Sequence, residues 1–501
     1  MSLDWLFIVS LSMVSLRNTS LSIASVLKET NFSNTVKFME IQHSFHGRQR
    51  ELRLLRELQA AVRDQGGSRF AVIAGKRRVG KTSLIRTALP PDEAMPQIFF
   101  YVNAQLGPAP NLKAFTETIR QSLGIAYPIA ARSFEEALGI VFEEARRRPV
   151  TLVIDEFQNI PDVAPDFLDA LQRIWDQRRA VSRLLLVVAG SGESAMREIF
   201  EREQSPLHTR SDTFIRLKPF SPELVKSILD EERPNHSGDD LLALYAFTGG
   251  VAQHLQVFLE AKALTLEDML REGVRSGSGW LMEAQLLIAE EFRSNAQTFN
   301  ELLALVAQGR ARRSELAENF DVNISGHLSK LENVFGLLER VEPLGRNGAE
   351  RGRIRYAVAD ELLDLWYAFI LPNMSELKTG RFDALRDRIR LAWPAWSLRS
   401  LRRFWLRYFR SLGIFTEVGP WWDRKGLNEI DLIAINSIRE RIVFAEIRRS
   451  ASANDQAALE FKAEAFLTHN PEYRRYERRF LRLSLEELAA GRRLPYEDAG
   501  V

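Results

Sequence analysis

A short glycine-rich segment between a buried-strand pattern and a helical pattern constrains this chain more than any other feature. The apolar run Phe70–Ala74 enters the segment and Ser83–Arg86 leaves it. A glycine-rich turn from strand to helix directs successive backbone N–H groups at an anion, and the helix dipole adds to the attraction. We therefore predict that a nucleoside triphosphate binds here, in contact with Gly75, Lys76, Arg77, Arg78, Val79, Gly80, Lys81, Thr82 and Ser83.

Two residues of this loop and two downstream carboxylates have the chemistry of phosphoryl transfer. We expect Lys81 to reach the β- and γ-phosphates and the Thr82 hydroxyl to hold Mg²⁺. The apolar run Thr151–Ile154 ends in Asp155 and Glu156. Asp155 is predicted to complete the Mg²⁺ shell and Glu156 to polarise the attacking water. The alternative is a core strand that ends in acidic residues at a sheet edge, and the loop upstream favours the nucleotide site.

Two more residues are candidates for catalysis. Ser191 follows the apolar run Leu184–Ala189. A polar residue at the end of the strand beside the acidic strand can sense the γ-phosphate, although turns also favour serine. Arg210 is either an arginine finger that stabilises transition-state charge or a surface arginine in a loop.

Composition sets the class of protein. The 501 residues predict two to four domains, and the 45% hydrophobic content supports packed cores. There is no cysteine, which excludes disulfides, thiolate metal sites and a cysteine nucleophile and fits a cytoplasmic location. The net charge of +2 is not that of a polycation. Because no run of 18 apolar residues occurs, we expect no membrane span.

The order of patterns along the chain predicts a multidomain α/β protein. Apolar strand patterns alternate with helical patterns up to Pro219, which indicates a parallel sheet covered on both faces. Residues 1–38 lack the basic segment of a signal peptide and are expected to be an extension outside the domains. The other predicted parts are a P-loop NTPase domain (39–218), a helical lid (219–295), a winged helix-turn-helix (296–372) and a small α/β domain (373–501).

Two segments could contact nucleic acid. In the helix-turn-helix, the groove would be faced by Asn323, Ser325, His327 and Lys330, and the alternative use of this unit is packing against protein. The segment 381–410 interleaves arginines with aromatic residues. That pattern suits either a nucleic-acid strand or a helix that covers its own core with flat arginine stems.

The motifs of the first half resemble those of the archaeal-type ATPase family of P-loop NTPases. In that family the segment equivalent to Gly47 and Arg48 lies near the bound nucleotide, and the resemblance implies ATP as the ligand. The family's glycine-any-proline signature would place proline where this chain has Ala252. The residues that carry the resemblance are Phe45–Arg48 with Glu51 and Leu52, Gly75–Thr82, Ile154–Glu156, Gly190 and Ser191, Ser205–Leu207 and Thr248–Gly250.

The C-terminal part resembles a restriction-endonuclease-like domain, apparently degenerate. Asp431 and Glu446 would lie on adjacent antiparallel strands and could hold a divalent metal between them. Arg448 stands where the family has lysine, and a guanidinium cannot act as a base. Arg402 aligns with the family's helical glutamate, while Glu429 could supply a spare carboxylate.

These observations predict an ATP-binding protein, specifically a Mg²⁺-dependent ATPase that acts as a molecular switch on a winged helix and a degenerate nuclease-like domain. Two other classes fit the same motifs. One is an ATP-regulated DNA endonuclease, and the other is a scaffold that binds nucleotide without hydrolysing it. The expected partners are ATP, DNA, and a second copy of the chain or another protein.

Overall fold

The computed structural model describes residues 46–191, 193–291, 296–345, 353–450 and 455–494. The predicted extension 1–38 lies outside these residues, as do residues 346–352 of the predicted winged helix-turn-helix. The chain divides into a unit up to His46 and a unit from Gly47 onward, and every element below belongs to the second.

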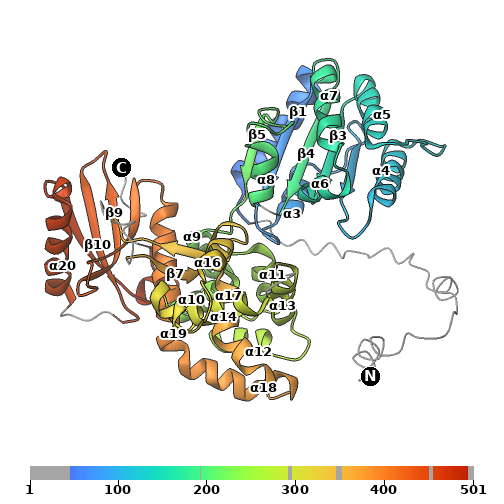
Figure 1. Cartoon of the computed structure of the whole chain (residues 1–501). Helices are drawn as coiled ribbons and strands as arrows, with labels where there is room; N and C mark the ends of the chain where they lie inside the picture. Colours follow the sequence, from blue (N-terminus) through green and yellow to red (C-terminus); the bar gives the residue numbers. More distant parts are fainter. Residues whose placement is uncertain (1–45, 192, 292–295, 346–352, 451–454, 495–501) are drawn as a thin grey trace. The chain divides into compact units, whose positions relative to one another are not determined.

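A five-stranded parallel sheet organises the first half of that unit (Figure 1). Its strands are β1 (Arg69–Ala74), β2 (Gln97–Tyr101), β3 (Val150–Asp155), β4 (Leu184–Gly190) and β5 (Thr213–Arg216), in the spatial order β2-β3-β4-β1-β5. Because both faces are covered, β3 and β4 are buried along their whole length. The order places β4 between the strand that enters the loop and the strand that ends in Asp155. The prediction of a parallel P-loop sheet is confirmed.

Helices connect and cover these strands. Their ends follow local signals: Ser133 caps α5 by accepting a hydrogen bond from the backbone N–H of Glu136, and Gly124 ends α4 in the left-handed conformation. The helices are α2 (Gln49–Ala60, extended by the π-turn Ala61–Gln65), α3 (Lys81–Ala88), α4 (Pro108–Leu123), α5 (Phe134–Arg147), α6 (Ile160–Val163), α7 (Phe167–Arg178) and α8 (Glu193–Phe200).

A purely helical segment follows, as the sequence predicts. Its elements are α9 (Pro222–Glu232), α10 (Gly238–Thr248), α11 (Ala252–Glu260), α12 (Leu266–Gly273) and α13 (Gly279–Glu291). Nearly every residue of α10 is buried, since α9, α12, α17 and α19 all pack against it. A helix that is apolar on all sides is stable only at such a centre.

Three helices and a two-stranded hairpin come next: α14 (Ala296–Ala307), α15 (Arg313–Ala317), α16 (Ser325–Asn333), β6 (Leu338–Val341) and β7 (Arg355–Val358). Asn323 and Lys330 are exposed, whereas the His327 ring packs 5.4 Å from the ring of Phe299. The use of this unit as a winged helix on DNA stays a prediction.

The arginine-rich segment forms one long helix, α19 (Phe382–Ser411), which follows α17 (Glu361–Leu365), two irregular turns (Trp366–Asn373) and α18 (Met374–Lys378). Its aromatic residues are buried except for the half-buried Phe382, and Arg403 pairs with both Glu361 (2.6 Å) and Asp364 (2.5 Å). Arg407 lies 3.3 Å from Glu361. Of the two uses of this pattern, the structure supports the helix that covers its own core.

A four-stranded sheet completes the chain, in the order β11-β10-β9-β8 (Figure 1). Its elements are β8 (Glu417–Trp422), β9 (Glu429–Asn436), β10 (Arg441–Ile447), the crossover helix α20 (Asp455–His469) and β11 (Glu477–Leu483). β8, β9 and β10 are antiparallel neighbours, and β11 joins β10 in parallel. This small α/β domain is the one predicted, with β11 as an additional strand.

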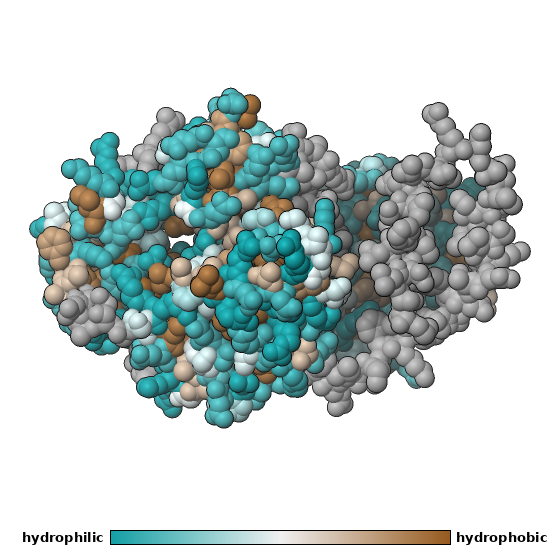
Figure 2. All heavy atoms as spheres, turned by 90° about the horizontal axis from the view of Figure 1, so that it is seen from below, coloured by the Kyte–Doolittle hydropathy of each residue, from teal (hydrophilic) through white to brown (hydrophobic). Residues whose placement is uncertain are grey.

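The surface is polar on the face shown in Figure 2, where apolar residues are scattered. Within the described ranges, no helix combines the length and apolar character needed to cross a membrane.

The buried ion pairs of α19 make a direct stability prediction. Burial lowers the pKa of Arg403, but the charges of Glu361 and Asp364 outweigh that effect and raise it. Arg403→Ala would leave both carboxylates buried without this partner, so we expect the free energy of unfolding to fall by about 3–5 kcal/mol. Urea unfolding followed by tryptophan fluorescence measures the change.

The matched control is Arg390→Ala, which removes the surface pairs of Arg390 with Glu267 and Asp387. It is expected to leave the urea midpoint nearly unchanged. Equal midpoints for the two variants would contradict the role assigned to the buried cluster.

Candidate nucleotide site

The loop between β1 and α3 has the backbone conformation of an anion cradle. Arg78 and Gly80 both have positive φ, at 64° and 99°. A Cβ on Gly75 would lie 2.3 Å from the carbonyl oxygen of Leu217, so only glycine fits there. The helix α3 begins at Lys81 and presents its N-terminus to the loop. The residues named by sequence are thus brought together in one turn.

Lys81 folds over this turn. Its buried ammonium donates to the carbonyl oxygens of Gly75 and Lys76, each at 3.0 Å. Burial lowers the pKa of Lys81, and the negative charges of Glu156 and Asp155 oppose that shift. The ammonium therefore lies over the loop, and its contact with nucleotide phosphates stays a prediction.

A hydrogen bond joins the loop helix to the end of β3. The Thr82 hydroxyl donates to Asp155 Oδ2 at 2.8 Å, and the Glu156 backbone N–H donates to Asp155 Oδ1 at 3.0 Å. Burial raises the pKa of Asp155, while the hydrogen bond from Thr82 lowers it. A hydroxyl and a carboxylate oxygen at this separation form a donor set that fits Mg²⁺, which takes one or two carboxylates beside substrate phosphates.

Glu156 is held from the neighbouring strand. Its backbone has a φ of 55°, which turns its side chain towards the end of β4. There the Ser191 hydroxyl donates to Glu156 Oε2 at 3.0 Å, and the amide of Gln158 donates to the same oxygen at 2.5 Å. The Ser191 backbone N–H in turn donates to Gln158 Oε1 at 3.1 Å. The three side chains form a closed triangle at the carboxyl edge of the sheet.

Gly47 and Arg48 lie where the chain passes from β5 to α9. The Arg48 guanidinium stacks 4.8 Å above the Phe220 ring and donates to the carbonyl oxygen of Lys218. Burial lowers the pKa of Arg48. Gly47 has a φ of 66°, a left-handed conformation that favours glycine. The segment borders the start of the helical region but forms no hydrogen bond to the loop among those observed.

Helical elements downstream also contact the loop. The backbone N–H of Gln253, in the first turn of α11, donates to the Arg78 carbonyl oxygen at 3.3 Å. The Arg78 side chain pairs with Glu283, which is buried on α13. Lys76 lies 3.7 Å from Asp360, the N-cap residue of α17. Two basic side chains of the loop are therefore engaged by carboxylates.

The remaining predicted residues occupy different surroundings. Val79 is buried, whereas Arg77 and Ser83 are exposed. Arg210 pairs with Asp176 of α7, with Nε 3.1 Å and Nη2 2.9 Å from its two carboxylate oxygens. In this chain the Arg210 guanidinium is thus joined to α7.

The two predicted metal ligands of the C-terminal domain also come together. Asp431 of β9 lies 2.8 Å from Arg402 and 3.0 Å from Arg448. Glu446 of β10 lies 3.1 Å from Arg448 and pairs with Lys462 of α20. Burial raises the pKa of Glu446, and the hydrogen bond from Lys462 opposes the shift. In the part of the chain that is described, no three His, Asp or Glu side chains cluster as a metal site would need.

Sequence reasoning missed four of these partners. Three of them, Glu283, Asp360 and Lys462, lie on other elements than their partners and meet them only in the folded chain. The fourth, Gln158, lies two residues after Glu156, and nothing in the local sequence marks it as a partner.

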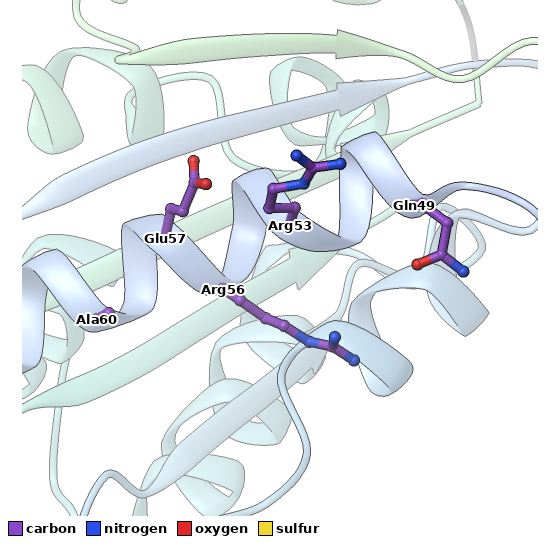
Figure 3. Close-up of a pocket in the computed structure, with 5 residues that line it drawn as sticks. All are labelled: Gln49, Arg53, Arg56, Glu57 and Ala60. Carbon is purple, nitrogen blue, oxygen red and sulfur yellow. The ribbon is translucent and has the colours of Figure 1, made fainter.

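A depression of about 400 Å³ lies on α2 and is lined by Gln49, Arg53, Arg56, Glu57 and Ala60. The side chains of Arg53 and Arg56 diverge in Figure 3. None of the lining residues belongs to the loop or to the ends of β3 and β4. The depression therefore takes no part in the nucleotide site.

The fold and the loop define a P-loop nucleotide-binding domain. Residues 45–258 match the family described as an ATPase domain predominantly from Archaea, and residues 366–459 match a family of archaeal and bacterial proteins of unknown function. The chain therefore carries an archaeal-type ATPase domain followed by this second conserved domain. The resemblance predicted from the sequence is confirmed, including that of the C-terminal sheet to the nuclease-like core.

One curated relative and several solved structures are similar over much of the chain. The uncharacterized protein MJECL04 of Methanocaldococcus jannaschii is 24% identical over 81% of this chain and 87% of its own length. The Walker-type ATPase PABY2304 of Pyrococcus abyssi is 19% identical over 64% of this chain and 95% of its own, with a TM-score of 0.47. The ORC2 protein of Aeropyrum pernix, solved with ADPNP and ADP, is 16% identical over 67% of this chain and 96% of its own. Its TM-score is also 0.47. Likeness at this level assigns no activity.

The contact between Arg78 and Glu283 predicts a competition with nucleotide. In Glu283→Gln the Arg78 guanidinium loses its charged partner and becomes available to phosphate, so the affinity for ATP should rise by about threefold to tenfold. Isothermal titration with a non-hydrolysable ATP analogue measures the affinity.

Glu272→Gln serves as the control. It removes the same charge from an ion pair that Glu272 forms with Arg275, three residues further along the chain, and that does not involve the loop. Its affinity should equal that of the unchanged protein. An unchanged or weaker affinity in Glu283→Gln would show that Glu283 does not compete for Arg78.

Proposed function

We propose that the chain is a Mg²⁺-dependent ATPase that works as a nucleotide-controlled switch. The observation that carries this proposal is the 2.8 Å hydrogen bond between Thr82 and Asp155, each of which is followed or preceded in the chain by a predicted catalytic residue, Lys81 before Thr82 and Glu156 after Asp155. A binding scaffold needs the loop alone. The placement of Glu156 beside that pair supports hydrolysis, because a carboxylate there can take a proton from water.

Binding would begin with the loop. The backbone N–H groups from Lys76 to Thr82 would hold the β-phosphate, and the Lys81 ammonium would exchange its two carbonyl partners for phosphate oxygens. Thr82 and Asp155 would hold Mg²⁺, directly or through water. The metal, when bound, neutralises charge that develops on the phosphates.

Hydrolysis would use the triangle at the edge of the sheet. Glu156 would orient the attacking water and accept its proton, and Ser191 and Gln158 would fix the direction of the Glu156 carboxylate. Arg210 is engaged by Asp176, so a role as arginine finger would require this ion pair to break. The homo-oligomer stays a prediction.

The switch would work through the basic residues of the loop. Phosphates compete with Glu283 for Arg78 and with Asp360 for Lys76, so occupancy would loosen the contacts of α13 and α17 with the loop. The helix α13 belongs to the predicted lid (219–295), and α17 belongs to the predicted winged helix-turn-helix (296–372). Nucleotide binding would thereby change how these parts are held.

DNA is the proposed partner of the helix-turn-helix unit. Lys330 and Asn323 are exposed on and before α16, and the Ser325 hydroxyl accepts a hydrogen bond from Arg313 at 2.6 Å. A short helix with exposed polar and basic side chains suits the major groove. The ATP-regulated endonuclease and the non-hydrolysing scaffold stay alternatives that the same assays distinguish.

Two loop and strand variants test the ATPase directly. Lys81→Ala should weaken ATP binding by more than about tenfold, because the phosphates lose their principal positive charge. Glu156→Gln should retain binding but lower phosphate release by about a hundredfold or more, because an amide accepts no proton from water. Calorimetry and a phosphate-release assay measure the two effects.

Lys113→Ala, on the exposed face of α4, is the matched control and should match the unchanged protein in both assays. Wild-type turnover in either site variant would remove the proposed assignment. Tight binding without phosphate release in the unchanged protein would instead favour the scaffold.

Ser191→Ala tests whether Ser191 positions Glu156. Turnover should fall by about tenfold while the affinity for ATP stays the same, because one of the two donors to the Glu156 carboxylate is lost. If Ser191 acts only through Glu156, then adding Ser191→Ala to Glu156→Gln should cost nothing further. An additive loss in the double variant would assign Ser191 an independent contact with the substrate.

A further inference from the structure

The carboxylate pair of the C-terminal domain is arranged unlike an open metal site. Asp431 and Glu446 project from neighbouring antiparallel strands, which pair through Leu432 and Ala445. Each of their four carboxylate oxygens has a basic partner. Arg402 pairs with one Asp431 oxygen and Arg448 with the other. Arg448 also pairs with one Glu446 oxygen, and Lys462 pairs with the second.

The partners come from three directions. Arg402 belongs to α19, Arg448 follows the end of β10 and Lys462 lies on α20. The backbone N–H of Ile447 also donates to Asp431 Oδ2 at 2.9 Å. The carboxylates are nearly buried, with exposed fractions of 11% for the Asp431 side chain and 5% for that of Glu446. The basic groups therefore enclose them.

The divalent metal implied by the nuclease-like resemblance does not fit this arrangement. A hard divalent cation binds deprotonated carboxylate oxygens that are open to it, and all four are in use here. Three positive charges against two negative ones also leave the centre with a net charge of +1, which repels a further cation. A guanidinium cannot lose its proton to make room.

We propose that Arg402, Arg448 and Lys462 occupy the place of the metal and make this a metal-free ion-pair centre. The cations bridge the carboxylates as a metal would. They thereby join α19, β9, β10 and α20 into one unit. This inference does not rest on the proposed ATPase function.

Manganese binding to the full, nucleotide-free chain tests the proposal, with electron paramagnetic resonance to count bound Mn²⁺. The unchanged protein and Asp431→Asn should bind the same number of Mn²⁺ ions. Any Mn²⁺ bound by Thr82 and Asp155 contributes equally to both counts, because both proteins retain these two residues. One equivalent of Mn²⁺ bound by the unchanged protein and lost in Asp431→Asn would overturn the proposal. DNA cleavage with Mn²⁺ that is lost in Asp431→Asn would do the same.

A gain of Mn²⁺ binding tests whether the arginines are what excludes the metal. The double variant Arg402→Glu with Arg448→Lys removes two guanidinium groups and adds a carboxylate, so its affinity for Mn²⁺ should rise by about tenfold or more. A folded double variant that binds no more Mn²⁺ than the unchanged protein would overturn the claim that these arginines exclude the metal.

Thermal unfolding in the presence of EDTA provides a readout without metal. In an empty metal site, Asp431→Asn would relieve repulsion between two carboxylates and raise the midpoint. In the ion-pair centre, the same change removes the partner of two cations and should lower the midpoint by several degrees. A raised midpoint would contradict the proposal.

Discussion

The hydrogen bond from Thr82 to Asp155 is the contact on which the chemistry of the first domain depends. It connects the helix after β1 to the end of β3, although β4 lies between these strands in the sheet. Only a parallel sheet brings the carboxyl ends of separate strands to one edge. The buried apolar runs that form the sheet therefore also determine where a hydroxyl, a carboxylate and the Lys81 ammonium meet.

The 68 basic residues of the chain are nearly balanced by 66 acidic ones, and many of these charges pair within the fold. The start of α17 illustrates it: Asp360 lies near Lys76 of the loop, and the next residue, Glu361, holds Arg403 and Arg407 of α19. Arg402 on the same helix belongs to the C-terminal centre. Many ion pairs in this molecule join elements to one another, and the buried ones break at a high free-energy cost when one partner is lost.

Sequence patterns predicted the parts whose signal is local. The loop, Asp155, Glu156 and the four long strands around them follow from continuous apolar runs and glycine placement, and Arg448 indicated a centre that departs from a nuclease. β11 escaped prediction because Arg478, Arg479 and Arg482 interrupt its apolar pattern. Glu283, Asp360 and Lys462 could not be found either, since their partners lie on other elements, and nothing local marks Gln158 as the partner of Glu156. The sequence also left open whether the arginines of α19 bind nucleic acid or cover the core of the protein. The carboxylates that pair with them in the structure support the second interpretation.

Calorimetric titration of the unchanged chain with a non-hydrolysable ATP analogue tests the central claim most directly. The account predicts binding of one nucleotide per chain, with an affinity that rises when Mg²⁺ is added, because Thr82 and Asp155 supply its ligands. Absence of heat at any Mg²⁺ concentration, or binding that Mg²⁺ does not change, would contradict it.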